Sequence, residues 1–176
     1  RQLLGLINDI LEMSRLESGK VTLENSHFNL RACITDCAEL FRSQAEQERK
    51  HFSEEIELET EEVYGDSSRL TQILNNILSN AVKFTPSGGS ICLAVCEIEH
   101  QEYTKYRITV SDTGAGMSEK FLERIFVPYE REVRFGARNV SGTGLGMSIV
   151  KNLITQMDGE ISVESQLGKG TVFTVT

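Results

Sequence analysis

Residues 67–85, SSRLTQILNNILSNAVKFT, decide the fold of this chain. Apolar residues recur here at intervals of three and four, the spacing of an amphipathic helix: Leu70, Ile73, Leu74, Ile77, Leu78, Ala81 and Val82. Asp66 precedes the stretch as an expected N-cap, and Pro86 follows it as an expected stop. The sequence therefore predicts a helix that packs one face against a core.

The other face of this helix carries an unusual row of polar side chains. Gln72, Asn76, Asn80 and Lys83 are spaced so that they stack along one side. A solvated helix face usually carries Glu and Lys, because Asn is a poor helix former. The row is therefore either a plain exposed face or a set of ligands for a polar, anionic molecule.

Length and charge narrow the class of protein. The 176 residues fit one domain of ordinary size. The net charge of −8, with no basic run to offset it, argues against a general nucleic-acid binder. No apolar run approaches the roughly 20 residues of a membrane helix, and no signal peptide opens the chain. We expect a cytoplasmic piece of a longer protein, itself without membrane contact, because the chain opens inside a predicted helix.

The four cysteines form two CxxxC pairs, Cys33 with Cys37 and Cys92 with Cys96. A four-thiolate metal site is conceivable, but zinc sites usually use tighter CxxC turns. Cys33 and Cys37 continue an apolar row in a helix predicted over residues 30–49, so buried thiols are the simpler interpretation. Reduced cysteines also fit the cytoplasm.

Further helices are predicted over residues 1–18, 118–125 and 148–157. The first has a wide apolar stripe and ends at Gly19, so it either joins a bundle or coiled coil or docks on the following domain. β-branched and aromatic runs predict strands at 51–58, 63–65, 91–98, 103–111, 160–165 and 171–176.

Two glycine-rich segments indicate a ligand. DTGAGM, residues 112–117, lets the backbone approach a ligand and holds a carboxylate at a strand end. An aspartic protease has a similar triplet but needs a second, equivalent carboxylate, which this chain lacks. GTGLGM, residues 142–147, opens a helix whose N–H groups favour phosphate. Its spacing fits neither the dinucleotide fingerprint nor the P-loop.

Residues 127–141, between these segments, have no regular pattern and are locally basic, with Arg131, Arg134 and Arg138. A long irregular stretch inside a compact domain is typical of a lid. Together the features suit a nucleotide with magnesium: a carboxylate can accept from the adenine amino group, Asn can hold a metal, and arginines can neutralise phosphates.

In this order the sequence resembles the catalytic ATP-binding domain of sensor histidine kinases, in the superfamily that includes gyrase and heat-shock chaperones. NNILSNAVKFT matches the N box, DTGAGM the first glycine box, FVPYER the F box, GTGLGMSIVKNL the second glycine box and GKGT, at 168–171, the third. Each match alone is weak, but five in the family's order are specific. Residues 1–19 look like the second helix of the dimerisation and phosphoacceptor hairpin, and residues 20–176 like the catalytic domain with a lid at about 127–141.

The resemblance implies an α+β fold, a two-layer sandwich. It has a mixed sheet of about five strands, three main helices on one face, and the N-terminal helix in front.

The resemblance also implies roles. Asn76 would bind magnesium, Asn80 phosphate and Lys83 a phosphate oxygen, while Asp112 would accept from the adenine amino group. The other implied ATP contacts are the glycine-box and lid residues Gly114, Gly116, Met117, Phe126, Arg131, Gly142, Thr143, Gly144, Leu145, Gly146 and Thr171. Phe126 would anchor the lid. Gln72 stands where many relatives have a carboxylate proposed to assist catalysis, and this departure weakens a general-base role for it. Phosphoryl transfer can proceed largely through positioning and electrostatics.

The implied reaction moves the γ-phosphate of ATP to a histidine and onward to an aspartate of a response regulator receiver domain. We expect the acceptor histidine upstream of Arg1 and a homodimer formed through the hairpin, because His27, His51 and His100 lie outside any acceptor motif. Two alternatives remain. A serine-directed kinase like the anti-sigma-factor kinases lacks the hairpin helix, and a non-catalytic nucleotide-binding module would have lost the boxes.

Overall fold

The computed structural model describes residues 2–19, 21–98, 102–132 and 142–176. Its centre is a mixed sheet of five strands in the order β2-β4-β5-β7-β6. Only the β2–β4 pair is parallel; the other neighbouring pairs are antiparallel. The strands are β2 (His51–Glu57), β4 (Ser90–Ile98), β5 (Lys105–Asp112), β6 (Ile161–Gln166) and β7 (Gly170–Val175).

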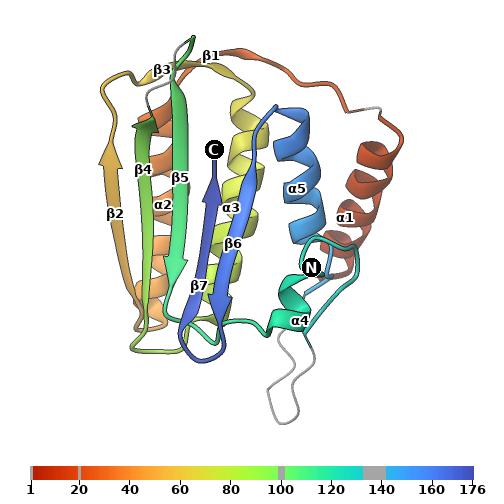
Figure 1. Cartoon of the computed structure of the whole chain (residues 1–176), viewed down its shortest axis with the longest axis vertical. Helices are drawn as coiled ribbons and strands as arrows, with labels where there is room; N and C mark the ends of the chain where they lie inside the picture. Colours follow the sequence, from red (N-terminus) through yellow and green to blue (C-terminus); the bar gives the residue numbers. More distant parts are fainter. Residues whose placement is uncertain (1, 20, 99–101, 133–141) are drawn as a thin grey trace.

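Three main helices cover one face of this sheet. Figure 1 shows α2 (Leu30–Gln47) and α3 (Ser67–Phe84) behind the strands, followed by α5 (Gly146–Gln156). The N-terminal helix α1 (Gln2–Glu17) lies outermost, beside α5. A small second sheet joins β1 (Ser26–Asn29) to β3 (Glu62–Gly65), and α4 (Glu119–Leu122) is a single turn. The predicted α+β sandwich is confirmed.

Helix α3 follows its sequence prediction closely. All seven apolar residues of its predicted core face are buried. Asp66 Oδ1 accepts from Arg69 N at 3.0 Å, which satisfies an N–H group of the first turn. Thr85 is extended, as a residue before proline prefers, so the helix ends there.

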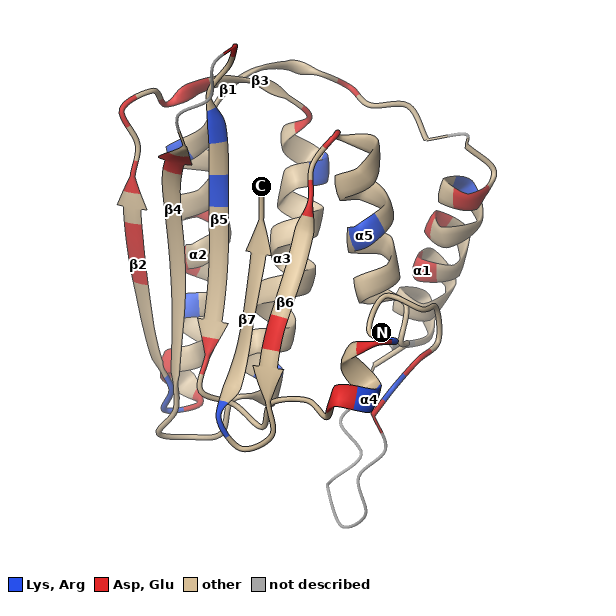
Figure 2. Ribbon diagram, viewed as in Figure 1, with Lys and Arg blue, Asp and Glu red and all other residues tan. Residues whose placement is uncertain are grey.

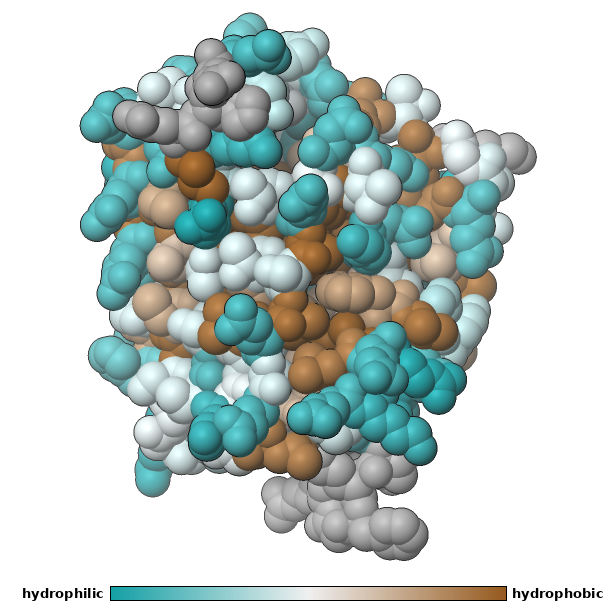
Figure 3. Space-filling model, in the orientation of Figure 1, coloured by the Kyte–Doolittle hydropathy of each residue, from teal (hydrophilic) through white to brown (hydrophobic). Residues whose placement is uncertain are grey.

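Buried and more exposed side chains alternate along the strands, so that one face of the sheet packs against the helices and the other stays open. In β4, Ile91, Leu93 and Val95 are buried toward the helices, whereas Cys92 and Cys96 alternate with them and lie on the open face. Figure 3 looks onto this open face, where white and brown residues cross the middle with teal residues scattered among them.

This alternation separates the two cysteine pairs. Cys33 and Cys37 lie in α2, where Cys33 Sγ is 3.6 Å from Thr71 Oγ1 of α3, on the opposite side of the sheet from Cys92 and Cys96. All four thiols are free. The four-thiolate metal site is therefore not formed, and the thiols are buried or half-buried as the simpler interpretation has it.

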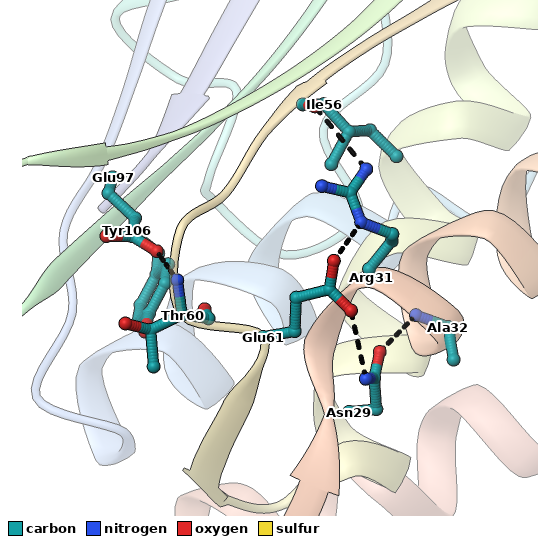
Figure 4. Close-up of polar contacts among 8 residues, drawn as sticks. All are labelled: Asn29, Arg31, Ala32, Ile56, Thr60, Glu61, Glu97 and Tyr106. Carbon is teal, nitrogen blue, oxygen red and sulfur yellow. Dashed lines mark hydrogen bonds and ion pairs between the residues drawn. The ribbon is translucent and has the colours of Figure 1, made fainter.

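A polar cluster fixes the end of the sheet away from Asp112 (Figure 4). Asn29 caps α2 and donates from Nδ2 to Glu61 Oε2 at 3.2 Å, and Arg31 pairs with the same carboxylate. Tyr106, at the start of β5, donates to Thr60 O at 3.3 Å. These contacts tie the connection before β3 to α2 and to β5.

Several boundaries differ from the sequence predictions. Strand β5 begins at Lys105 rather than at 103, α4 ends at Leu122 rather than at 125, and α5 begins at Gly146 rather than at 148. The sequence did not predict the start of α5 because no side chain caps this helix: Leu145, which has no hydrogen-bonding side chain, occupies the N-cap position. A periodicity argument finds helix interiors better than uncapped ends.

Helix α1 docks on the domain that follows it, which is one of the two expectations for its apolar stripe. Met13 and Leu16 are 6% and 5% exposed, so one side docks on the domain. Leu3, Leu4 and Leu11 are more than half exposed, at 70%, 66% and 52%. Within the described part of the chain, no helix combines the length and apolarity needed to cross a membrane.

Candidate functional site

A hollow of about 1010 Å³ lies at the end of the sheet where β5 finishes, between α3 and the glycine-rich segment before α5. Its size suits a small-molecule ligand. Of the site residues predicted from the sequence, those that line the hollow are Asn76, Asn80, Lys83, Asp112, Gly114, Gly116, Met117, Arg131, Gly142, Thr143, Gly144, Gly146 and Thr171.

One end of the hollow is built around Asp112, the last residue of β5. It is paired with Thr171 in β7, and its Oδ1 accepts from Gly114 N at 2.8 Å. Burial raises the pKa of Asp112, and the N–H groups of Gly114 and Thr171 oppose that rise. The result is a fixed hydrogen-bond acceptor in a half-buried position.

The glycines of the first box allow close backbone packing next to Asp112. A Cβ placed on Gly114 would lie 2.6 Å from Phe84 O at the end of α3. Gly116 has a φ of +65°, and a Cβ there would overlap the backbone of Gln166. The box is thus held between α3 and the β6–β7 turn, a reason for glycine that does not involve a ligand.

Ser165 in β6 is a residue of the site that the sequence reasoning missed. Its Oγ accepts from Met117 N at 2.8 Å, donates to Gly170 O at 2.8 Å, and lies 2.8 Å from Thr171 Oγ1. It therefore joins the first glycine box to the third. A single serine in a strand gives no local signal for this role.

The other end of the hollow brings the polar row of α3 against the glycine-rich segment. Gly142 lies so close to Lys83 that a Cβ would be 2.8 Å from Nζ. A Cβ on Gly146 would be 3.4 Å from Asn76 Oδ1. Burial lowers the pKa of Lys83, and the nearby charge of Arg131 lowers it further.

Helix α5 begins at this end of the hollow. The first N–H groups of any helix lack an intrahelical partner, and in α5 no capping side chain accepts from them either. Together with Lys83 and Arg131 they make this end suited to an anion.

The segment before α5 is joined to the start of the predicted lid. Tyr129 N donates to Gly144 O at 2.9 Å, and both residues have positive φ angles, 65° and 73°. Ser118 N donates to Glu132 Oε1 at 3.1 Å, which fixes the segment to α4. Residues 133–141, with Arg134 and Arg138, lie outside the described part of the chain.

Three predicted site residues do not line the hollow. Gln72 turns away along α3 and accepts from Arg69 Nη1 at 2.8 Å. Leu145 is fully buried in the core. Phe126 packs against the core beside Lys151, whose Nζ is 5.8 Å from the ring centroid. His27 and His51 are exposed in β1 and β2, and His100 lies outside the described residues.

Asp9 of α1 lines the hollow, although it was not among the site residues predicted from the sequence. Thr143 Oγ1 donates to Asp9 Oδ2 at 2.8 Å. Asp9 lies one turn before Met13 and two turns before Leu16, the two buried residues of α1. The sequence signal for Asp9 was its position on the face of α1 that docks, but the sequence alone does not show which face docks.

Comparisons with known proteins agree with this geometry. Residues 65–176 match the family described as "Histidine kinase-, DNA gyrase B-, and HSP90-like ATPase". The chain is similar to the sensor histidine kinase GacS of Pseudomonas protegens, 38% identical over 175 residues, which is 99% of this chain and 19% of that protein. The autoinducer 2 sensor kinase/phosphatase LuxQ of Vibrio vulnificus is 37% identical over 174 residues, 97% of this chain and 20% of that protein. The chain thus spans about a fifth of the length of these relatives.

Solved structures give the same result. Full-length ShkA in complex with AMPPNP superposes with a TM-score of 0.82 at 30% identity, covering 98% of this chain and 35% of that one. The catalytic domain of histidine kinase ThkA gives 0.71 at 31% identity, covering 86% and 93%. ThkA in complex with the response regulator TrrA gives 0.74 at 29% identity, covering 98% and 46%.

Proposed function

The chain belongs to the histidine kinase-, DNA gyrase B- and HSP90-like ATPase family, as the ATPase/kinase domain of a sensor histidine kinase, and from this premise we propose that its hollow binds Mg-ATP for phosphoryl transfer to histidine. The observation that carries the proposal is the contrast between the two ends of the hollow. A half-buried acceptor, Asp112, stands at one end, and a helix start suited to an anion stands with Lys83 at the other.

Adenine lies at the Asp112 end in this proposal. Its amino group donates to the carboxylate, which Gly114 N already orients. If Asp112 did not accept from it, the amino group would be desolvated without a partner, at a cost of roughly 1–3 kcal/mol of binding free energy. Met117 and Thr171, which line the same end, form its walls.

The phosphates lie at the other end, over the start of α5. Its N–H groups, Lys83 and Arg131 offset their charge, and Asn80 donates an amide hydrogen. Gly142, Gly144 and Gly146 leave the backbone accessible there, with Thr143 between them.

Asn76 is the proposed protein ligand of magnesium. Among the described residues no three acidic, His or Cys side chains gather to hold a metal. That fits a Mg²⁺ ion held mainly by phosphate oxygens and water, with one amide oxygen from the protein. The ion would supply charge neutralisation at the phosphates.

The chain's own residues act by positioning. Gln72 accepts a hydrogen bond from Arg69 and does not line the hollow, so we assign no general base in this chain. Binding, orientation and electrostatic compensation account for the catalytic contribution of these residues.

The proposal extends to the whole protein. Residues 1–19 form part of a hairpin that carries the acceptor histidine and dimerises, and residues 20–176 form the catalytic domain with Phe126 anchoring the lid. A cytoplasmic response regulator receives the phosphoryl group. The exposed apolar side of α1 supports the hairpin, and the ThkA–TrrA complex supports the kind of partner.

Calorimetric titration with ATP in excess magnesium tests the site. We expect Asp112→Ala to weaken ATP binding by ten- to hundredfold or more, because the adenine amino group loses its half-buried acceptor. The matched control is Asp36→Ala, an exposed aspartate on α2. Equal ATP affinity in Asp112→Ala and Asp36→Ala would refute the assignment of the adenine end.

A further inference from the structure

Helix α1 docks beside the nucleotide hollow. Met13 and Leu16 are buried against the domain, and Ser148 Oγ of α5 lies 3.8 Å from Met13 Sδ. Figure 1 shows the two helices side by side, and Figure 2 shows acidic residues on several turns of α1. Negative charge is thus brought next to the end of the hollow that otherwise suits an anion.

Asp9 is the member of this acidic set that lines the hollow itself. Its Oδ2 accepts from Thr143 Oγ1 at 2.8 Å, while the same hydroxyl accepts from Leu145 N at 3.2 Å. The hydroxyl has one hydrogen to donate, so a phosphate that took this hydrogen bond would displace the carboxylate.

A second contact holds α1 in this position. Glu12 Oε1 pairs with Arg69 Nη1 at 2.6 Å, and their side chains are 19% and 24% exposed. The same Arg69 nitrogen donates to Gln72 at 2.8 Å. Asp9 is therefore held at the hollow by an ion pair and by apolar packing, and not by the Thr143 contact alone.

We propose that Asp9 makes the site sensitive to nucleotide charge: while α1 is docked, its carboxylate competes with the terminal phosphate for Thr143 and for the positive end of α5. Docking of α1 and binding of a triphosphate then oppose each other, and by reciprocity ATP weakens the docking. This inference rests on the proposed nucleotide site and adds to it a residue from outside the matched region 65–176.

Three ligands of increasing charge test the inference: adenosine, ADP and ATP, titrated calorimetrically in excess magnesium. Asp9→Asn removes the charge but keeps an oxygen that can accept from Thr143. We expect it to bind ATP about tenfold more tightly, an effect between that of a charge pair about 4 Å apart in bulk water and that of one near a protein surface. The gain is smaller for ADP, absent for adenosine, and reduced at high salt. The control is Glu17→Gln, which removes one charge from an exposed position on the same helix.

The outcomes separate this inference from the proposed function. If Asp9→Asn binds ATP no better than the parent, or less well, Asp9 does not oppose the triphosphate and the inference is wrong. If Glu17→Gln gains as much as Asp9→Asn, the effect is one of net charge and the inference is also wrong. If the parent binds neither adenosine nor ATP, the proposed function itself fails.

Discussion

Two opposing effects act on the pKa of Asp112. Burial disfavours its charge, whereas the N–H groups of Gly114 and Thr171 favour it. Because burial dominates, the folded protein raises the pKa of this carboxyl above its usual range. A charged Asp112 at neutral pH therefore costs folding stability.

Asp112→Asn should expose this cost. The variant keeps an oxygen for Gly114 N but has no charge, so we expect a higher Tm than the parent at pH 7 and weaker ATP binding. Since the pKa is raised on folding, the penalty is full above the folded-state pKa. It fades as pH falls through that value toward the ordinary aspartate pKa. Thermal unfolding followed by circular dichroism between pH 4 and 8 measures this, with 1 kcal/mol worth about 2–4 °C at this size. A lower Tm for the variant at pH 7 would show that the charge stabilises the fold.

The sequence predicted most of the side chains that meet at the hollow, but it did not predict the contacts that hold them in place. Asn76 could be identified because Asn is unusual inside a helix, Lys83 because of its spacing from Asn76 and Asn80, and Asp112 because it opens a glycine box at a strand end. The role of Ser165 could not, because its partners Met117 and Thr171 come from two other segments of the chain.

Helix α3 combines two faces with separate functions. Its apolar face forms the core, and Asn76, Asn80 and Lys83 of its polar row line the hollow. The periodicity of the sequence predicted both faces, and Asp66 and Pro86 predicted the two ends. It could not predict the turn of Gln72 away from the hollow, because that depends on Arg69 and, through it, on Glu12 of another helix.

Asn76→Ala tests the polar row without threatening the helix, because alanine is the better helix former. We expect its ATP affinity to fall about tenfold more in magnesium than in EDTA, since it loses one ligand of the ion; a factor of ten is about 1.4 kcal/mol. Asn75→Ala is the matched control, the same residue type one position away and not lining the hollow. Equal losses with and without magnesium would mean that Asn76 acts on the nucleotide directly.

At the scale of the whole molecule, the site depends on pairings that no local pattern reveals. β7 lies between β5 and β6, which sets Asp112 against Thr171 and places the third glycine box beside the first. The family resemblance predicted the layers and the number of strands. The docking of α1 against α5, and with it Asp9, follows only from the assembled structure.

The central claim is that adenine binds at the Asp112 end of the hollow and the phosphates bind over the start of α5. Amide chemical shifts of the ¹⁵N-labelled chain, recorded with adenosine and then with Mg-ATP, test it most directly. The account predicts that adenosine shifts the amides of Gly114, Gly116 and Thr171, and that ATP additionally shifts those of Gly142, Gly144 and Gly146. Shifts from ATP that leave residues 142–146 unchanged, or that fall on the open face of the sheet, would contradict it.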